Sequence, residues 1–192
     1  TDGSKGSDAI AAREGSNTII NNGAISTQGN SSRGIFASGN QNTITNTGAI
    51  TTVNSAGIRT NLGNQNIIVN SGAITTSGPG SLGILATGNS NNISNSGSIT
   101  TTGVADGATS ADGIYSDGNS NTVTNSGSVI SYFGKAIAFS GSGNILNLAN
   151  SSFLGGVIDL GTGTQINIAT AANYSKLINY TGTLSGSITA SG

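Results

Sequence analysis

The chain has 192 residues, of which six are Lys or Arg, seven are Asp or Glu, and none is Cys. This balanced charge argues against a nucleic-acid partner, which needs a basic stripe, and against an anionic membrane surface. The absence of cysteine excludes a disulfide framework and a thiolate site. No apolar run approaches the roughly 20 residues that span a bilayer, so we expect no membrane insertion of this segment.

A twelve-residue unit recurs along the chain. It reads G-N-Q-N-T-I-T-N-T-G-A-I at residues 39–50 and returns at 63–74, 88–99 and 118–129, after a first copy at 15–25 that is one residue shorter. The equivalent branched residues, spaced by 25, 24, 25 and 30 positions, are Ile19, Ile44, Ile68, Ile93 and Val123. A fixed period in this range indicates a repeat architecture.

Each unit is followed by a variable loop and then by a Gly-Ile or Ala-Ile step. One period therefore holds three short β-type runs between Gly, Asn and Ser turns, a pattern that disfavours helices. We predict an all-β fold, a right-handed parallel β-helix with three short strands per coil of about 20–30 residues and about eight coils, the hand following from the crossover rule. The longest loop, residues 103–111, accounts for the widest spacing.

The repeat divides the chain into two parts of the same β-helix. Residues 1–142 hold the regular repeats, and residues 143–192 are expected to form tighter coils and a terminal cap. Within the second part, residues 143–148 match residues 163–168 at a spacing of about 20 positions. The cap is expected over residues 174–188, because the last coil of a repeat stack otherwise exposes a strand edge.

Strand alternation predicts which side chains face inward. If Ile44 faces the core, so do Asn42, Asn46, Gly48 and Ile50. A buried amide without partners costs about 1–3 kcal/mol, and stacked coils about 4.8 Å apart provide those partners. We therefore predict a structural asparagine ladder formed by Asn21, Asn46, Asn70, Asn95 and Asn125. Gly23, Gly48, Gly72, Gly97 and Gly127 follow these asparagines by two residues and fit a bend that excludes Cβ.

The repeats resemble a known family. Tandem G-N-x-N-T-I-x-N-x-G-x-I-T-T units with intervening G-I-x-x-x-G steps, over about residues 9–168, resemble the passenger domains of bacterial autotransporters, the β-helical stalks of type V secretion. The run L-G-G-V-I-D-L at residues 154–160 is similar to the closing coils of such stalks. The resemblance implies an outer-membrane or secreted location and, often, adhesion or self-association. Against the family pattern, the translocating barrel is absent and the rod is short, so a processed piece or a stand-alone β-helix is expected.

The sequence offers no catalytic group and no cofactor site. Acid–base catalysis needs two tuned groups about a substrate's width apart, and the repeat contains no such pair, so we expect no enzyme. The one acidic cluster lies in D-G-A-T-S-A-D-G-I-Y-S-D-G-N, where oxygen ligands around a loop are a weak candidate for Ca²⁺. Its members are Asp106, Asp112, Asp117 and Asn119. Asp-Gly is also ordinary turn chemistry, which is the alternative interpretation.

Two outward files are candidates for contact surfaces. The first is a contact ridge made of Phe36, Arg59, Leu85 and Tyr115, and the second is a flat threonine face made of Thr51, Thr75 and Thr100. Neutral drift of the repeats is the alternative interpretation of both files. In favour of a contact role, the apolar side chains of the ridge adjoin one another and lie next to few charges, which is more apolar surface than scattered exposed residues would give.

We expect a non-enzymatic bacterial surface or secreted β-helix that acts by contact, as an adhesin, a stalk or a self-associating filament subunit. Its partner is expected to be itself, by lateral or end-to-end association, or a host or cell-surface ligand. An ice-binding solenoid is an alternative, based on the threonine face. A fibre subunit that polymerises end to end through its N-terminal coil is another.

Overall fold

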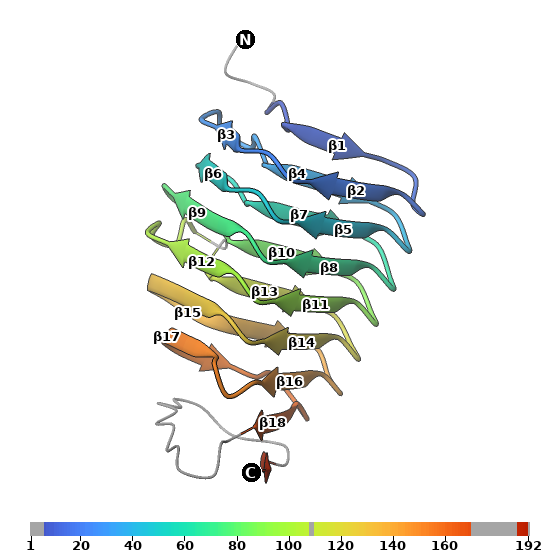
Figure 1. Ribbon diagram of the computed structural model, residues 1–192, viewed down its shortest axis with the longest axis vertical. Coiled ribbons are helices and arrows are strands. Elements are labelled where there is room, and N and C mark those ends of the chain that lie inside the picture. Colours follow the sequence, from blue (N-terminus) through green and yellow to red (C-terminus); the bar gives the residue numbers. More distant parts are fainter. Residues whose placement is uncertain (1–5, 108–109, 170–187, 192) are drawn as a thin grey trace.

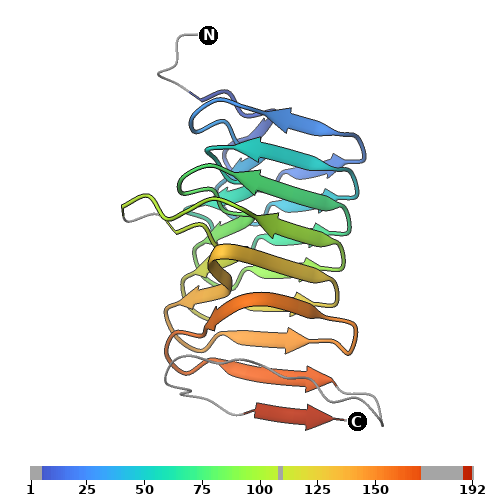
Figure 2. The ribbon, with the colours of Figure 1, turned by 90° about the vertical axis from the view of Figure 1, so that its left-hand side faces the viewer.

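The computed structural model describes residues 6–107, 110–169 and 188–191. Within these residues every strand pair is parallel, and the fold is an all-β parallel solenoid of about six turns (Figures 1 and 2). None of the described residues belongs to a helix, and so none forms a helix long and apolar enough to cross a membrane.

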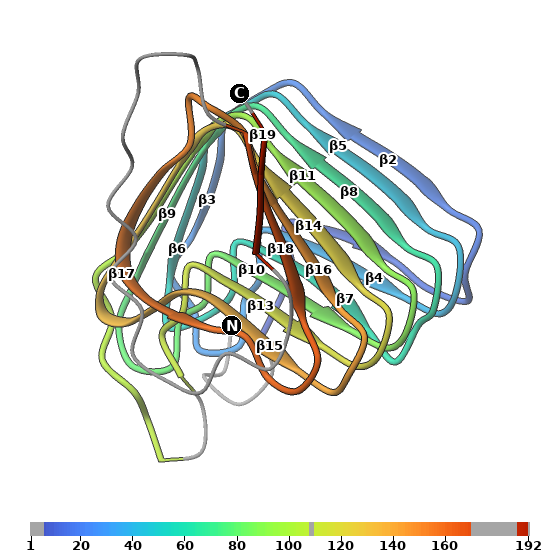
Figure 3. The ribbon, with the colours of Figure 1, turned by 90° about the horizontal axis from the view of Figure 1, so that it is seen from below.

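Over the described residues the strands form two parallel sheets, one of eleven strands and one of eight, around a common interior (Figure 3). The larger sheet has two stacks joined through β15, which pairs with both β12 and β13, and we call these two stacks and the smaller sheet the first, third and second files. The first file consists of β1 (Ile10–Ala12), β4 (Ile35–Ser38), β7 (Ile58–Asn61), β10 (Ile84–Thr87), β13 (Ile114–Asp117) and the end of β15 (Ser128–Ser140). The second file consists of β2 (Thr18–Asn21), β5 (Thr43–Asn46), β8 (Ile67–Asn70), β11 (Asn92–Asn95), β14 (Thr122–Asn125), β16 (Ile145–Leu148), β18 (Gln165–Ala169) and β19 (Ile188–Ser191). The third file consists of β3 (Ile25–Thr27), β6 (Ile50–Val53), β9 (Ala73–Ser77), β12 (Ser98–Thr101), the start of β15, and the start of β17 (Phe153–Asp159). The end of β17 pairs with the end of β15 and so continues the first file.

The core is made of equivalent aliphatic side chains, most of them isoleucine, stacked from coil to coil. Ile44 lies opposite Ile68 in the second file, and Ile50 lies opposite Ile74 in the third file. These four side chains are at most 1% exposed. Because successive strand residues point to opposite faces, the strict spacing of the isoleucines places them in continuous columns. Each fully buried isoleucine contributes about 1.5–3 kcal/mol relative to an exposed one.

Glycine forms the bend between the second and third files, because neighbouring coils approach closely there. A Cβ added to Gly48 would lie 1.9 Å from the backbone oxygen of Gly23, and one added to Gly72 would lie 2.0 Å from that of Gly48. Gly97 and Gly127 repeat the contact at 2.1 and 2.0 Å. The predicted bend that excludes Cβ is confirmed at Gly48, Gly72, Gly97 and Gly127, whereas a Cβ added to Gly23 would meet nothing within 4 Å.

Two irregularities lie where the spacing of the repeat changes. The 103–111 insertion falls between β12 and β13, in the loop from the third to the first file, where it leaves the strand register unchanged. One coil later that loop is missing, and β15 runs on as one strand whose residues 128–131 pair with β12 and whose residues 137–140 pair with β13.

The shorter coils that follow residue 142 also keep the parallel register. β16 pairs with β18 through Ile145 opposite Gln165 and Leu146 opposite Ile166, as the match between residues 143–148 and 163–168 predicts. The cap expected over residues 174–188 lies outside the described residues, apart from Ile188 at the start of β19.

Candidate functional site

A ladder of buried asparagines runs along the end of the second file. Asn46 Nδ2 donates to Asn70 Oδ1 at 2.8 Å and to the backbone oxygen of Gly48 at 2.9 Å. The same pair of bonds recurs in each coil from Asn21 to Asn95. The predicted ladder is therefore confirmed at Asn21, Asn46, Asn70, Asn95 and Asn125. Because these amides are buried and fully engaged with one another, their role is structural.

Two further asparagine files lie at the corner between the first and second files. The sequence predicts the inward direction of Asn42, but not that its equivalents form a hydrogen-bonded file. In the buried file, the backbone N–H of Asn42 donates to Asn66 Oδ1 at 2.8 Å. In the exposed file the direction is reversed, and the backbone N–H of Asn64 donates to Asn40 Oδ1 at 2.8 Å. Gln41, between the two asparagines of its coil, has a φ of 59°. The chain turns sharply there, and the side-chain amides satisfy backbone groups that strand pairing cannot reach.

The structure does not bring the acidic loop residues together as a calcium site. Asp112 is buried, and its Oδ1 accepts a hydrogen bond from the backbone N–H of Lys135 at 2.7 Å. Asp117 accepts from a serine hydroxyl of the next coil, Asn119 belongs to the exposed asparagine file, and Asp106 lies at the edge of a groove. Across the described residues no three His, Cys, Asp or Glu side chains are grouped to hold a metal. These residues serve turns and contacts between coils.

The predicted threonine face has the expected register. Thr51 lies opposite Thr75 and Thr75 opposite Thr100 on the outside of the third file, all at least partly exposed. Ser26 and Ile130 continue the file at its two ends. The alignment of the hydroxyl groups is confirmed, and their use in ice binding stays a prediction.

The predicted contact ridge is in register but differs in exposure. Pairing places Phe36 opposite Arg59, Arg59 opposite Leu85, and Leu85 opposite Tyr115. Phe36, however, is only 4% exposed, and the Arg33 guanidinium lies 3.8 Å from the centre of its ring. The prediction that Phe36 is an exposed contact residue is wrong, because a cation from the preceding loop covers the ring. Arg59 and Leu85 line a groove.

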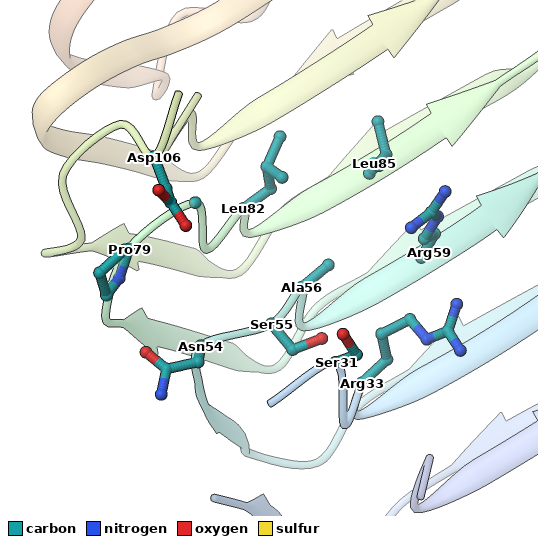
Figure 4. Close-up of a pocket in the computed structure, with 11 residues that line it drawn as sticks. Ser31, Arg33, Asn54, Ser55, Ala56, Arg59, Pro79, Leu82, Leu85 and Asp106 are labelled. Atoms are coloured by element: carbon teal, nitrogen blue, oxygen red, sulfur yellow. The ribbon is translucent and has the colours of Figure 1, made fainter. Parts of the chain in front are cut away.

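This groove lies beside the loops that lead into the first file, and its volume is about 390 Å³ (Figure 4). Figure 4 shows the side chains of Arg33 and Arg59 extending in the same direction from adjacent coils, while Asp106 lies at the opposite end of the groove. Between them, the wall combines polar Ser55 with apolar Leu82. The groove thus has a basic end and an acidic end.

The two arginines of the groove differ in how their charges are balanced. Arg33 forms an ion pair with Asp8, with Nε–Oδ1 and Nη2–Oδ2 distances of 2.7 and 3.0 Å. Arg59 donates from Nη2 to Asn61 Oδ1 at 2.8 Å, while its buried Nε has no hydrogen-bond acceptor. Burial and then the positive charge of Arg33 lower the pKa of Arg59, and the carboxylate of Asp8 acts in the opposite direction. Of the two arginines, Arg59 is therefore the one whose positive charge has no carboxylate partner within the described residues.

A second outward surface, on the second file, was not identified from the sequence. Along each strand two alternate residues face outward, so this second-file surface is two residues wide. Its members are Thr18 and Ile20, Thr43 and Thr45, Ile67 and Val69, Asn92 and Ser94, Thr122 and Thr124, Ile145 and Asn147, and Gln165 and Asn167. Ile20, Ile67 and Val69 are 63, 42 and 38% exposed. The surface combines hydroxyl, amide and branched apolar groups, and none of these residues is charged.

Among the described residues, charge is confined to the first file, its loops, β15 and β17, and the third-file strands β3, β6, β9 and β12 are uncharged as well. The charged side chains of the described residues are Asp8, Arg13, Glu14, Arg33, Arg59, Asp106, Asp112, Asp117, Lys135 and Asp159. They lie on the first file, in the loops next to it, or on β15 and β17. Lys135 Nζ contacts Asp159 Oδ2 at 2.6 Å, and this hydrogen bond raises the pKa of Lys135 and lowers that of Asp159. The second-file strands carry no charge over the described residues.

Comparison of the chain with protein-family models, curated proteins and solved structures gives no significant match. Function is therefore inferred from the surfaces described above.

Proposed function

We propose that this chain is a non-enzymatic β-solenoid of the bacterial surface or of the secreted fraction, and that it acts by contact. The contact surface is the outside of the second file, and its partner is a second copy of the chain. The resemblance of the repeats to autotransporter passenger domains supports an extracellular role as an adhesin, a stalk or a filament subunit. This proposal moves the contact surface away from the Phe36 file, because that ring is covered.

The observation that carries the proposal is the separation of charge from the second-file surface. Exposed Ile20, Ile67 and Val69 stand among uncharged polar residues on that surface. Two copies that meet through it bury branched apolar groups against one another without desolvating an ion, which is the costly part of many interfaces. A formal net charge of −1 also leaves little repulsion between copies. Because the surface extends over many coils, weak contacts add along the rod.

The finer architecture belongs to this proposal as well. We expect a right-handed winding, three strands in each coil, about eight coils, and a division between regular and tighter coils at residues 142 and 143. A high-resolution density map of the purified chain, in which the coils are counted and their hand is read, tests these four statements.

Sedimentation velocity over a range of concentrations, with negative-stain electron microscopy alongside, tests the association. The chain is expected to form dimers or bundles as its concentration rises. Replacing Ile67 and Val69 together by Lys puts two like charges on the second-file surface, and we expect this variant to remain monomeric under all conditions in which the parent chain associates.

The matched control is Ala73 and Thr75 replaced together by Lys. These residues are also exposed and two positions apart, but they lie on β9, the third-file strand of the same coil. This variant is expected to associate like the parent. A parent chain that stays monomeric, or equal loss of association in both variants, contradicts the proposal. Loss of association only when the exposed Tyr132 and Phe133 are replaced by Ser would place the contact on β15 instead.

Ice binding is a second candidate, favoured by the paired threonines of the second file. Thr43 with Thr45, and Thr122 with Thr124, place methyl and hydroxyl groups about 6.6 Å apart along a strand, while coils repeat at about 4.8 Å. The coils between these two pairs carry Ile67 with Val69 and Asn92 with Ser94 at the same positions, so the candidate ice-binding surface is uncharged but its threonine pairs are interrupted. Thermal hysteresis of the purified chain tests it, and Thr45→Tyr is expected to remove the activity. Activity lost only in Thr75→Tyr would assign it to the third-file threonines, and no hysteresis rejects this function.

A further inference from the structure

The basic end of the groove in Figure 4 holds a positive charge that no ion pair among the described residues neutralises. Of the three charged groups at its basic end, Asp8 is engaged by both Nε and Nη2 of Arg33. One carboxylate against two guanidinium groups leaves one positive charge in excess. Among the described residues, no carboxylate forms an ion pair with Arg59. Arg59 Nη2 instead donates to the neutral amide oxygen of Asn61.

The environment of Arg59 makes this excess of positive charge unfavourable. The side chain is half-buried, its Nε is fully buried without an acceptor, and Arg33 lies on the adjacent coil with the same charge. A half-buried cation that lacks a counter-charge is stabilised when an anion binds beside it. Guanidinium groups suit carboxylates in particular, because planar N–H donors match the two oxygens.

The rest of the groove has the mixed character that a sugar ring requires. Ser55 and Asn54 offer hydroxyl and amide groups, and Leu82 and Leu85 offer apolar surface. Asp106, at the end remote from the arginines, accepts hydrogen bonds but repels a second acid group. The groove therefore favours a ligand with one acid group at one end and hydroxyl groups at the other.

We propose that this groove binds a carboxylate-bearing sugar, with the acid group beside Arg59 and the ring along the loop side chains. The site lies on the first-file side of the rod, away from the second-file surface, and it does not depend on self-association. Through this groove, a protein that acts by contact would recognise an acidic saccharide.

The probe is glucuronate, titrated into ¹⁵N-labelled chain at millimolar concentration, with the Arg59 side-chain Nε–H and the backbone amides of Ala56 and Leu85 observed by NMR. Glucose, which has the same ring without the acid group, is the matched neutral ligand. We expect glucuronate to shift these signals in a saturable way and glucose to leave them unchanged. Arg59→Gln is expected to weaken glucuronate binding at least tenfold, and Arg59→Lys to weaken it less.

Arg13→Gln is the matched protein control, because it removes one exposed positive charge from the same side of the rod without touching the groove. It is expected to bind glucuronate like the parent. Three results overturn the proposal: no saturable shift with glucuronate, equal weakening in Arg13→Gln and Arg59→Gln, or equal shifts with glucose. If inorganic sulfate binds as tightly as glucuronate, the site selects charge alone and the sugar assignment is wrong. Unchanged circular dichroism of the variants shows that the fold is kept.

Discussion

Replacing Asn95 by Leu measures what the asparagine ladder contributes to stability. Asn95 Nδ2 donates to Asn125 Oδ1 at 2.8 Å and to Gly97 O at 3.2 Å, and its Oδ1 accepts from Asn70 Nδ2 at 2.8 Å. Leucine removes all three bonds. At about 1 kcal/mol for each buried hydrogen bond, the free energy of unfolding falls by about 3 kcal/mol. The leucine itself fits, because Leu148 occupies the same position of the file, opposite Asn125.

The last member of the ladder provides an internal comparison. Asn125 accepts from Asn95 and donates to Gly127 O, so Asn125→Leu loses two bonds rather than three. Its free energy of unfolding is expected to fall by about 2 kcal/mol. Urea unfolding followed by far-ultraviolet circular dichroism measures both variants. If Asn95→Leu unfolds at the same urea concentration as the parent, or if Asn125→Leu is the less stable variant, the ladder bonds do not set the stability of the rod.

Gly72→Ala is expected to lower the free energy of unfolding by about 1–3 kcal/mol, because the Cβ of the alanine would lie 2.0 Å from Gly48 O. Gly23→Ala, where an added Cβ meets nothing within 4 Å, is expected to melt close to the parent; similar melting of both variants would contradict this packing argument. Lys135 and Asp159 predict a pH dependence. The lowered pKa of Asp159 adds stability that is present above its ordinary value of 3.8 and is lost as the pH falls through the lowered value. The raised pKa of Lys135 adds stability that is present below 10.5 and is lost as the pH rises through the raised value. The difference in free energy of unfolding between the parent and Asp159→Asn should therefore be small, because both groups are over 40% exposed. It should not change with pH near neutrality, and it should disappear in strong acid. A difference that grows on acidification would refute this assignment.

The interior of the rod is the part that the sequence predicts well. Counting in steps of two gives the direction of Ile44, Asn46 and Gly48, and the fixed period gives their neighbours in the next coil. Both rules depend only on backbone geometry that every coil repeats. The parallel solenoid and the asparagine ladder follow from them.

The surface depends on contacts that a period does not encode. Phe36 has the outward direction that alternation predicts, but Arg33 from the preceding loop covers it, and that depends on side-chain conformation. The groove beside Arg59 arises from loops of unequal length, which shape a wall across several coils. The sequence does not predict the second-file surface, because its residue types change from coil to coil, as from Thr45 to Val69. What the residues of this surface share is that none is charged, and this shared property is seen only when the strands are aligned by their pairing.

The asparagine files also bear on how such a protein changes in length. Their hydrogen bonds between coils join each residue to its equivalent in the adjacent coil, so an interior coil presents the same groups on both of its sides. Duplication or loss of one whole repeat therefore leaves every remaining amide with a partner of the same kind. A gene for this rod can lengthen or shorten in steps of one coil while each product still folds, and the reach of the molecule is open to selection separately from its surface chemistry.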